Sequence, residues 1–232
     1  MIKGIKFVLA TLLLPACWGL SCAVYTLYAQ SAQGGSGWEV WALPTGFLLW
    51  TVFFFLLPRP TRAYVLGHEL THALWALLMG ARVGKMRVGK VSGEVEVSKS
   101  NFLITLAPYF FPFYTVLVLL LYAISSIWIA PTQSWVWCLG AVGFSWAFHL
   151  TFTIHTLTAR QSDVQQHGRL FSYVIIYGMN LLVIAGWMIL IGAPRFDTFF
   201  HLSFQEISKS YLWVWKQGIF VISWVNGIQS EV

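Results

Sequence analysis

Apolar runs long enough to cross a lipid bilayer dominate this chain. Hydrophobic residues make up 58% of its 232 residues and charged residues only 9%, which is far from the balance of soluble domains. Such runs are expected to be helices, because a segment in hydrocarbon must satisfy its own backbone hydrogen bonds. They lie at about Ile5–Tyr28, Val40–Leu57, Phe102–Ile124, Trp135–Leu157 and Leu170–Gly192. We therefore predict an all-α polytopic membrane protein with about six transmembrane helices in one membrane-embedded domain.

The carboxyl-terminal part is less regular. Pro194 to Ser210 is a mixed stretch, and Tyr211 to Ile228 is rich in Trp but interrupted by polar residues. An interfacial helix and a seventh crossing both fit the second stretch, and we favour the interfacial helix. Within the single domain we expect two accessory helices over 1–57, a core over 64–192 and a tail over 194–232.

The net charge of +6 does not indicate a nucleic-acid partner. The Lys and Arg residues lie in short loops, where they orient transmembrane helices. The cysteines, Cys17, Cys22 and Cys138, all lie in apolar runs and follow neither a disulfide framework nor a zinc-binding spacing. We interpret them as small buried apolar residues. The first apolar run continues well past Cys17, which favours an uncleaved helix over a lipoprotein-type signal.

The segment His68-Glu69-Leu70-Thr71-His72 reads H-E-x-x-H within the apolar stretch 64–79. Residues four apart share one face of a helix, so both imidazoles can bind one zinc ion. Glu69, between them, can act as the general base toward a water molecule. The alternative is a pair of core histidines that hydrogen-bond to their neighbours. A pair spaced by four around a glutamate favours the metal site.

A catalytic zinc ion takes three protein ligands, so a third is needed. Asp163 is the leading candidate because the chain's other aspartate, Asp197, lies in a distant loop. The alternative for Asp163 is an N-cap of the helical run that follows it. His167, one helical turn later, is a rival ligand or a hydrogen-bond partner of a ligand. His149 and His155, on the preceding span, are further alternatives.

Residues 81–100 are the strand-like part of the chain. Val91 to Val97 partly alternates between apolar and polar residues, which predicts a β-hairpin or small sheet with Gly93 as a candidate turn. The alternative is a basic loop. In the apolar run that follows, Pro108 and Pro112 should kink the helix or delay its start.

The segment 64–79, which carries the H-E-x-x-H sequence, is called the motif helix below. The distribution of the 14 Lys and Arg residues indicates how this helix lies in the membrane. If 64–79 crossed fully, these residues would divide almost evenly, and Asp163 would face the side opposite His68. If the motif helix and hairpin instead form a re-entrant unit, eleven of the 14 fall on one side and two on the other, with Lys216 left out. We adopt the re-entrant arrangement, in which the N-terminus and the site face the cytoplasm.

These residues resemble the site-2 protease family of intramembrane zinc metalloproteases. The resemblance rests on Tyr64 to Arg82, with Gly67-His-Glu-Leu-Thr-His-Ala and Gly80-Ala-Arg-Val, and on Leu106-Ala107-Pro108-Tyr109, which is similar to distant bacterial members. It implies a membrane-associated β-hairpin after the motif helix. It also implies an aspartate near the start of a later helix as third ligand, which Asp163 matches without the usual Leu-Asp-Gly neighbours.

The resemblance further implies a zinc metalloendopeptidase of the bacterial cell membrane, with Zn²⁺ as cofactor and the bilayer and a transmembrane protein substrate as partners. The substrate helix would be locally unwound, and the exposed edge of the hairpin can pair with the extended segment. One alternative is a non-proteolytic, zinc-containing scaffold or chaperone that binds transmembrane segments, but the intact Glu69 argues against it. Another is an ion transporter, against which the single-sided arrangement argues.

The re-entrant arrangement predicts the side of the membrane that particular positions face. In a background without the native cysteines, Arg59→Cys, Lys90→Cys and Arg160→Cys should react with an impermeant thiol reagent only from the cytoplasmic side. Gly35→Cys and Gln133→Cys should react only from the other side. Labelling of position 90 from outside, with position 59 protected, would mean that the motif helix crosses completely.

Overall fold

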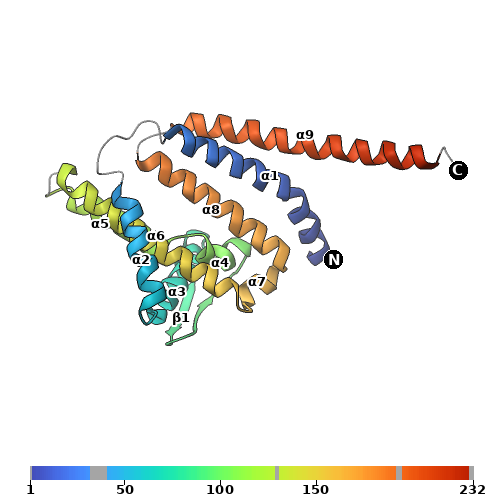
Figure 1. Cartoon of the computed structure of the whole chain (residues 1–232). Coiled ribbons are helices and arrows are strands. Elements are labelled where there is room, and N and C mark those ends of the chain that lie inside the picture. Colours follow the sequence, from blue (N-terminus) through green and yellow to red (C-terminus); the bar gives the residue numbers. More distant parts are fainter. Residues whose placement is uncertain (1, 32–40, 129–130, 192–194, 230–232) are drawn as a thin grey trace. The chain divides into compact units, whose positions relative to one another are not determined.

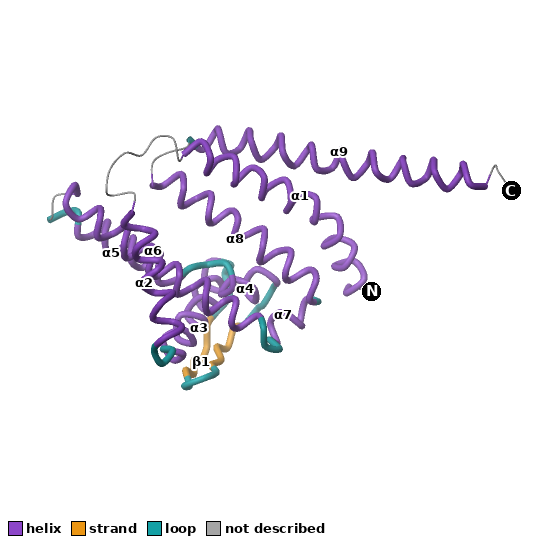
Figure 2. Tube along the Cα trace, viewed as in Figure 1, coloured by secondary structure: helices purple, strands orange, loops and turns teal. Residues whose placement is uncertain are grey.

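The structure is a computed structural model that describes residues 2–31, 41–128, 131–191 and 195–229. Most of these residues are helical, and the part described contains one two-stranded antiparallel sheet (Figure 2). The predicted helical class and the predicted hairpin are therefore confirmed. Gly35, one of the positions in the labelling prediction, lies outside the described residues.

The chain forms two compact units, which we describe separately. One comprises Met1–Gly35 and Gly168–Val232, and we call it the α1–α8–α9 unit after its helices α1 (Ile2–Ser31), α8 (Arg169–Ile191) and α9 (Phe196–Gln229). The other comprises Ser36–His167, and we call it the site unit.

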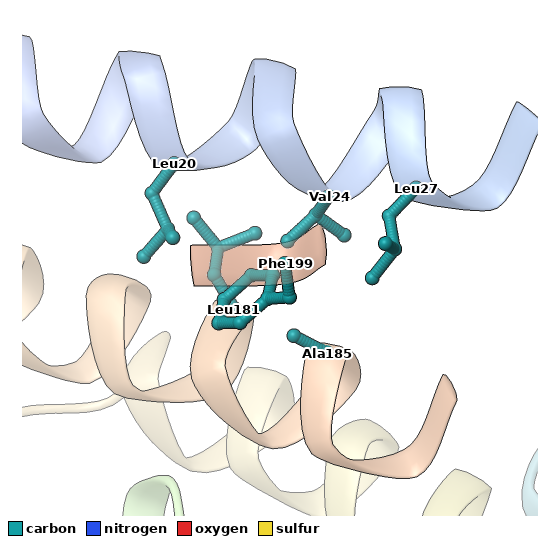
Figure 3. Packing of buried hydrophobic residues seen from close by; sticks show 6 residues of the cluster. All are labelled: Leu20, Val24, Leu27, Leu181, Ala185 and Phe199. Carbon is teal, nitrogen blue, oxygen red and sulfur yellow. The ribbon is translucent and has the colours of Figure 1, made fainter. Parts of the chain in front are cut away.

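In the α1–α8–α9 unit, α1 packs against both of the other helices. Their contact is a small aliphatic cluster with one phenylalanine (Figure 3), made of Leu20, Val24, Leu27, Leu181, Ala185 and Phe199. Only 22% of the most apolar window of α1 and 28% of that of α8 is buried. Most of the apolar surface of these helices therefore faces outward, as in helices that contact lipid.

The helix α9 differs from the sequence prediction. It is one continuous helix of 34 residues (Figure 1), whereas we predicted a mixed stretch that ends before a separate helix. The reason is tertiary packing. Gly19 of α1 leaves room for the backbone of Ile207, and Tyr211 Oη donates a hydrogen bond to the Leu12 carbonyl at 2.7 Å. Contact with α1 thus extends the helix through the mixed stretch. Whether its distal half crosses the membrane or lies in the interface stays a prediction.

The site unit is an assembly of short elements around one long helix. In chain order these are α2 (Ala42–Leu56), α3 (Thr61–Leu78), β1 (Val83–Val88), β2 (Gly93–Val97), α4 (Phe102–Leu106), the 3₁₀ turn η2 (Ala107–Tyr109), α5 (Phe113–Ser125), α6 (Pro131–Leu157) and α7 (Ser162–His167).

Glycines allow α2 and α6 to approach closely. A Cβ on Gly46 would collide with the Gly140 carbonyl, and a Cβ on Gly143 would collide with the Leu43 carbonyl. Small residues serve this purpose between membrane helices, where dispersion contacts rather than the hydrophobic effect hold the helices together. Next to the glycines, Trp50 lies in a cluster of phenylalanines and donates its indole N–H to Thr151 at 2.9 Å.

Among the described residues, three helical segments are long and apolar enough to cross a membrane: Lys3–Gln30, Trp135–Leu157 and Arg169–Leu190. A fourth is present if Phe102–Tyr109 and Phe113–Ser125 form one broken span, which bends by 77°. The bend follows Pro108 and precedes Pro112, the N-cap residue of α5, so the predicted proline kink is confirmed. The predicted count of about six crossings is not reached by length and hydropathy alone.

The hairpin pairs β1 with β2 in an antiparallel register, with an irregularity near the start of β1. The Gly89 N–H donates to the Ser92 carbonyl at 2.9 Å and closes the turn. Gly93 is the first residue of β2 and pairs with Val88, so our choice of Gly93 as the turn is wrong. Its small size instead allows β2 to lie directly against Glu69 of α3.

The glycine contacts predict that one of two alanine substitutions on α6 destabilises the protein and that the other is tolerated. Gly143→Ala should lower the free energy of unfolding by about 1–3 kcal/mol, because its Cβ meets the α2 backbone and the helices must separate. Gly140→Ala is the matched control, since its Cβ would lie 3.7 Å from the Ala42 carbonyl, an ordinary contact. Thermal unfolding in detergent measures both, and equal melting temperatures would contradict the packing described.

Candidate metal centre

Two helices bring together three side chains that could hold a metal ion. His68 and His72 lie one turn apart on α3, with ring centroids 4.9 Å apart. Asp163 lies in the first turn of α7, and its Oδ2 is 3.5 Å from His68 Nε2 and 3.6 Å from His72 Nε2. These three residues are the one group of histidine, cysteine or acidic side chains in the described ranges whose atoms converge as metal ligands do.

The spacing fits a metal ion better than a direct ion pair. Zinc–ligand bonds of about 2.0–2.1 Å at the tetrahedral angle place two ligand atoms about 3.3 Å apart. A charge-assisted N–H···O hydrogen bond would instead bring nitrogen and oxygen to about 2.7–2.9 Å. The observed 3.5 and 3.6 Å are close to the first value. Two imidazoles and one carboxylate are also a donor set that catalytic zinc uses.

The environment keeps Asp163 in the ionised form that a ligand requires. Burial alone would raise the pKa of its carboxyl group. The adjacent imidazoles of His68 and His72 outweigh this effect and hold the pKa well below its usual range. The oxygen that faces the two histidines therefore carries negative charge at neutral pH.

The orientation of His72 follows from the start and end of α4. Asn101 caps this helix, because its side chain accepts hydrogen bonds from Leu103 N and Ile104 N. Four residues after Ile104 stands Pro108, which has no N–H to donate to the Ile104 carbonyl. That carbonyl instead accepts from His72 Nδ1 at 2.8 Å. Because Nδ1 donates, the lone pair of Nε2 is free for a metal.

His68 has a weaker partner. Its Nδ1 lies 3.4 Å from Tyr64 Oη, one turn earlier on α3. The Tyr64 ring is held by Phe152 of α6, on which it stacks with ring centroids 4.7 Å apart and planes inclined by 8°. Gly67 allows α3 to approach α5 closely, since a Cβ at this position would meet the ring of Tyr114 on α5. The motif helix is thus packed against both α5 and α6.

Asp163 also has a partner from outside α3. Tyr109 Oη donates to Asp163 Oδ2 at 3.0 Å. Each of the three candidate ligands therefore has a neighbour that orients it, as ligands of protein metal sites do. In the sequence, Tyr109 stands out only as part of the resemblance. The part played by the Ile104 carbonyl was not predicted, although Pro108, four residues later, indicates a carbonyl without its helical partner.

A cavity of about 560 Å³ lies beside the three candidate ligands, and Glu69 lines it together with them. The strand β2 borders this cavity along its length. Glu69 is only 6% exposed, because Gly93 at the start of β2 lies directly against it. A Cβ on Gly93 would come within 2.7 Å of Glu69 Cγ and 2.9 Å of Oε1. Only glycine fits at this position without displacing the carboxylate.

The hairpin tip is hydrogen-bonded to the beginning of the motif helix α3. Thr61 Oγ1 donates to the Lys90 carbonyl at 2.9 Å. Two residues before Thr61, Arg59 donates to His155 Nε2 near the end of α6 at 3.3 Å. The start of α3, the hairpin tip and the end of α6 therefore meet at the same end of the site unit.

The other residues considered as ligands lie elsewhere. His167 is buried on α7 and His149 is buried on α6, outside the group of three. His155 lines the cavity and contacts Arg59. Asp197 is an exposed residue of the α1–α8–α9 unit and pairs with Arg195 at 3.1 Å.

No protein-family model matches this chain, and no curated protein or solved structure is significantly similar to it.

The geometry predicts which substitutions abolish metal binding. Purified protein should carry about one zinc ion per chain. His68→Ala and His72→Ala should lose it, and Asp163→Ala should reduce occupancy by roughly 10-fold or more. Elemental analysis for zinc, iron and manganese measures the content. His155→Ala is the matched control, because it removes a cavity-lining imidazole outside the group. Full occupancy in Asp163→Ala, with loss in His167→Ala, would reverse the assignment of the third ligand.

Proposed function

We propose that this protein is an intramembrane zinc metalloprotease of the site-2 protease type, which cleaves peptide bonds of transmembrane segments. One observation carries the proposal: Glu69 lines the same cavity as His68, His72 and Asp163, the three residues whose side chains could hold a metal ion. A metal site without hydrolytic chemistry has no need of a buried glutamate beside it. An ionisable group in an apolar helix is costly unless it has a function.

The residues have separate roles in the proposed reaction. His68, His72 and Asp163 hold the zinc ion, which supplies Lewis-acid chemistry at the scissile carbonyl when bound. Glu69 accepts a proton from the attacking water and then donates it to the leaving amine. The contact with Gly93 fixes the Glu69 side chain toward the cavity.

The hairpin suggests how a substrate is held. In the two-stranded sheet, β1 covers one edge of β2, and β2 borders the cavity. An extended peptide can add to the other edge of β2 through main-chain hydrogen bonds, which bind any sequence that can unwind. Aliphatic side chains around the cavity, among them Val95, Val97 and Ile104, suit an apolar segment.

The re-entrant arrangement also forms part of the proposal. The helix α3 is not among the described helices with the length and hydropathy of a crossing. The Thr61–Lys90 hydrogen bond supports the same side of the membrane for the start of α3 and the hairpin tip. With Arg59 and Arg160 at the same end, the positive-inside rule favours a site that opens toward the cytoplasm.

The proposed base makes a specific prediction. In detergent-purified protein, Glu69→Gln should reduce cleavage of fluorogenic single-span peptides by roughly 100-fold or more, because the amide cannot accept the proton. Its zinc content should stay at the wild-type level, since Glu69 is not a ligand. Mass spectrometry of the products identifies the bonds that are cut.

Glu96→Gln is the matched control, because Glu96 is an exposed carboxylate of the hairpin whose side chain is not part of the cavity lining. It should cleave at close to the wild-type rate. Wild-type protein that holds zinc and retains the peptides without cutting any of them would contradict the protease and favour a scaffold for transmembrane segments.

A further inference from the structure

The hydroxyl of Tyr109 is directed at the oxygen of Asp163 that faces the two histidines. The same atom, Oδ2, lies 3.0 Å from Tyr109 Oη, 3.5 Å from His68 Nε2 and 3.6 Å from His72 Nε2. The Tyr109 hydroxyl is the donor of this hydrogen bond, and the Asp163 oxygen accepts it. The hydrogen bond is thus made with the same carboxylate oxygen that lies near the two histidines.

Tyr109 also contacts a second candidate ligand. Its ring meets the His68 imidazole edge-on, with centroids 5.3 Å apart and planes inclined by 88°. The side chain has no exposed surface and is among the largest fully buried ones. A tyrosine fixed in this way restrains a carboxylate and an imidazole that belong to different helices.

The position of Tyr109 is set by the backbone around it. It is the last residue of η2, a single 3₁₀ turn whose middle residue is Pro108. The bend between α4 and α5 follows directly. By contrast, Asp163 lies on α7, a helix of only six residues that cannot be stable by itself. The better-anchored partner is therefore the tyrosine.

We propose that Tyr109 is a positioning residue of the metal centre, which holds Asp163 as a one-oxygen ligand and thereby sets metal affinity and coordination geometry. With a metal bound, the Asp163 oxygen that accepts from Tyr109 would also be the ligand atom, and the hydrogen bond would oppose rotation of the carboxylate toward two-oxygen binding. The inference rests on the proposed metal centre but not on peptidase activity.

The test uses the full-length protein in detergent, with zinc affinity measured by competition against a chelator. Tyr109→Phe removes one oxygen atom and retains the ring, and it should weaken zinc binding by roughly 10-fold. The visible spectrum of the cobalt-substituted protein should change as well, because it reports coordination geometry. Tyr114→Phe is the matched control, since the Tyr114 hydroxyl donates to the Ala63 carbonyl and not to a ligand. It should change neither the affinity nor the spectrum.

A double-substitution cycle tests whether the effect passes through Asp163. In an Asp163→Ala background, Tyr109→Phe should cause no further loss of affinity, because the atom it acts on is absent. Equal losses in both backgrounds, or a Tyr109→Phe protein with wild-type affinity and cobalt spectrum, would overturn the inference. Wild-type protein that binds no metal would overturn the metal centre itself.

A more conservative variant covers the case in which Tyr109→Phe does not fold. 3-Fluorotyrosine placed at position 109 keeps the hydroxyl and the fold. Its fluorine resonance should shift when zinc is added, whereas the same label at Tyr122 should not respond. An unchanged resonance at position 109 would contradict contact between this hydroxyl and a metal ligand.

Discussion

The approach of one carboxylate to two imidazoles determines how the site unit is arranged. Asp163 is on a helix of six residues that has little stability of its own, so its position depends on side chains outside that helix. His68 and His72 supply two of these contacts and Tyr109 the third. Three segments far apart in the sequence are thus brought together around one oxygen atom. Gathering one carboxylate and two imidazoles in a partly buried place costs free energy, unless an ion or a reaction uses the arrangement.

The parts of the site that the sequence predicts are those set by local spacing or by scarcity. Two histidines four apart must share a helix face, whatever the rest of the chain does. Asp163 could be named because the chain offers only one other aspartate. The kink after Pro108 is equally local, since proline cannot continue a helical hydrogen-bond pattern. The hairpin after the motif helix was predicted from partial alternation and is present, although its turn lies a few residues earlier than expected.

What could not be predicted depends on packing between distant segments. Gly93 was mistaken for a turn because glycine has two uses, a special backbone angle and close approach, and sequence alone does not separate them. It is needed for its small size against Glu69. The continuous helix α9 depends on its contact with α1, which no local pattern reveals. The role of the Ile104 carbonyl is carried by the backbone, so the identity of residue 104 gives no sign of it.

The contact between Gly93 and Glu69 has a consequence for the products of the proposed reaction. Because Gly93 of β2 lies directly against Glu69, the proposed base, the strand edge and this carboxylate are fixed relative to one another. A peptide added to β2 keeps the same side chains facing the cavity only if it shifts by two residues at a time. Each such shift moves the chain by about 6.6–6.8 Å. Alternative cuts in one substrate would then yield fragments whose lengths differ by even numbers of residues.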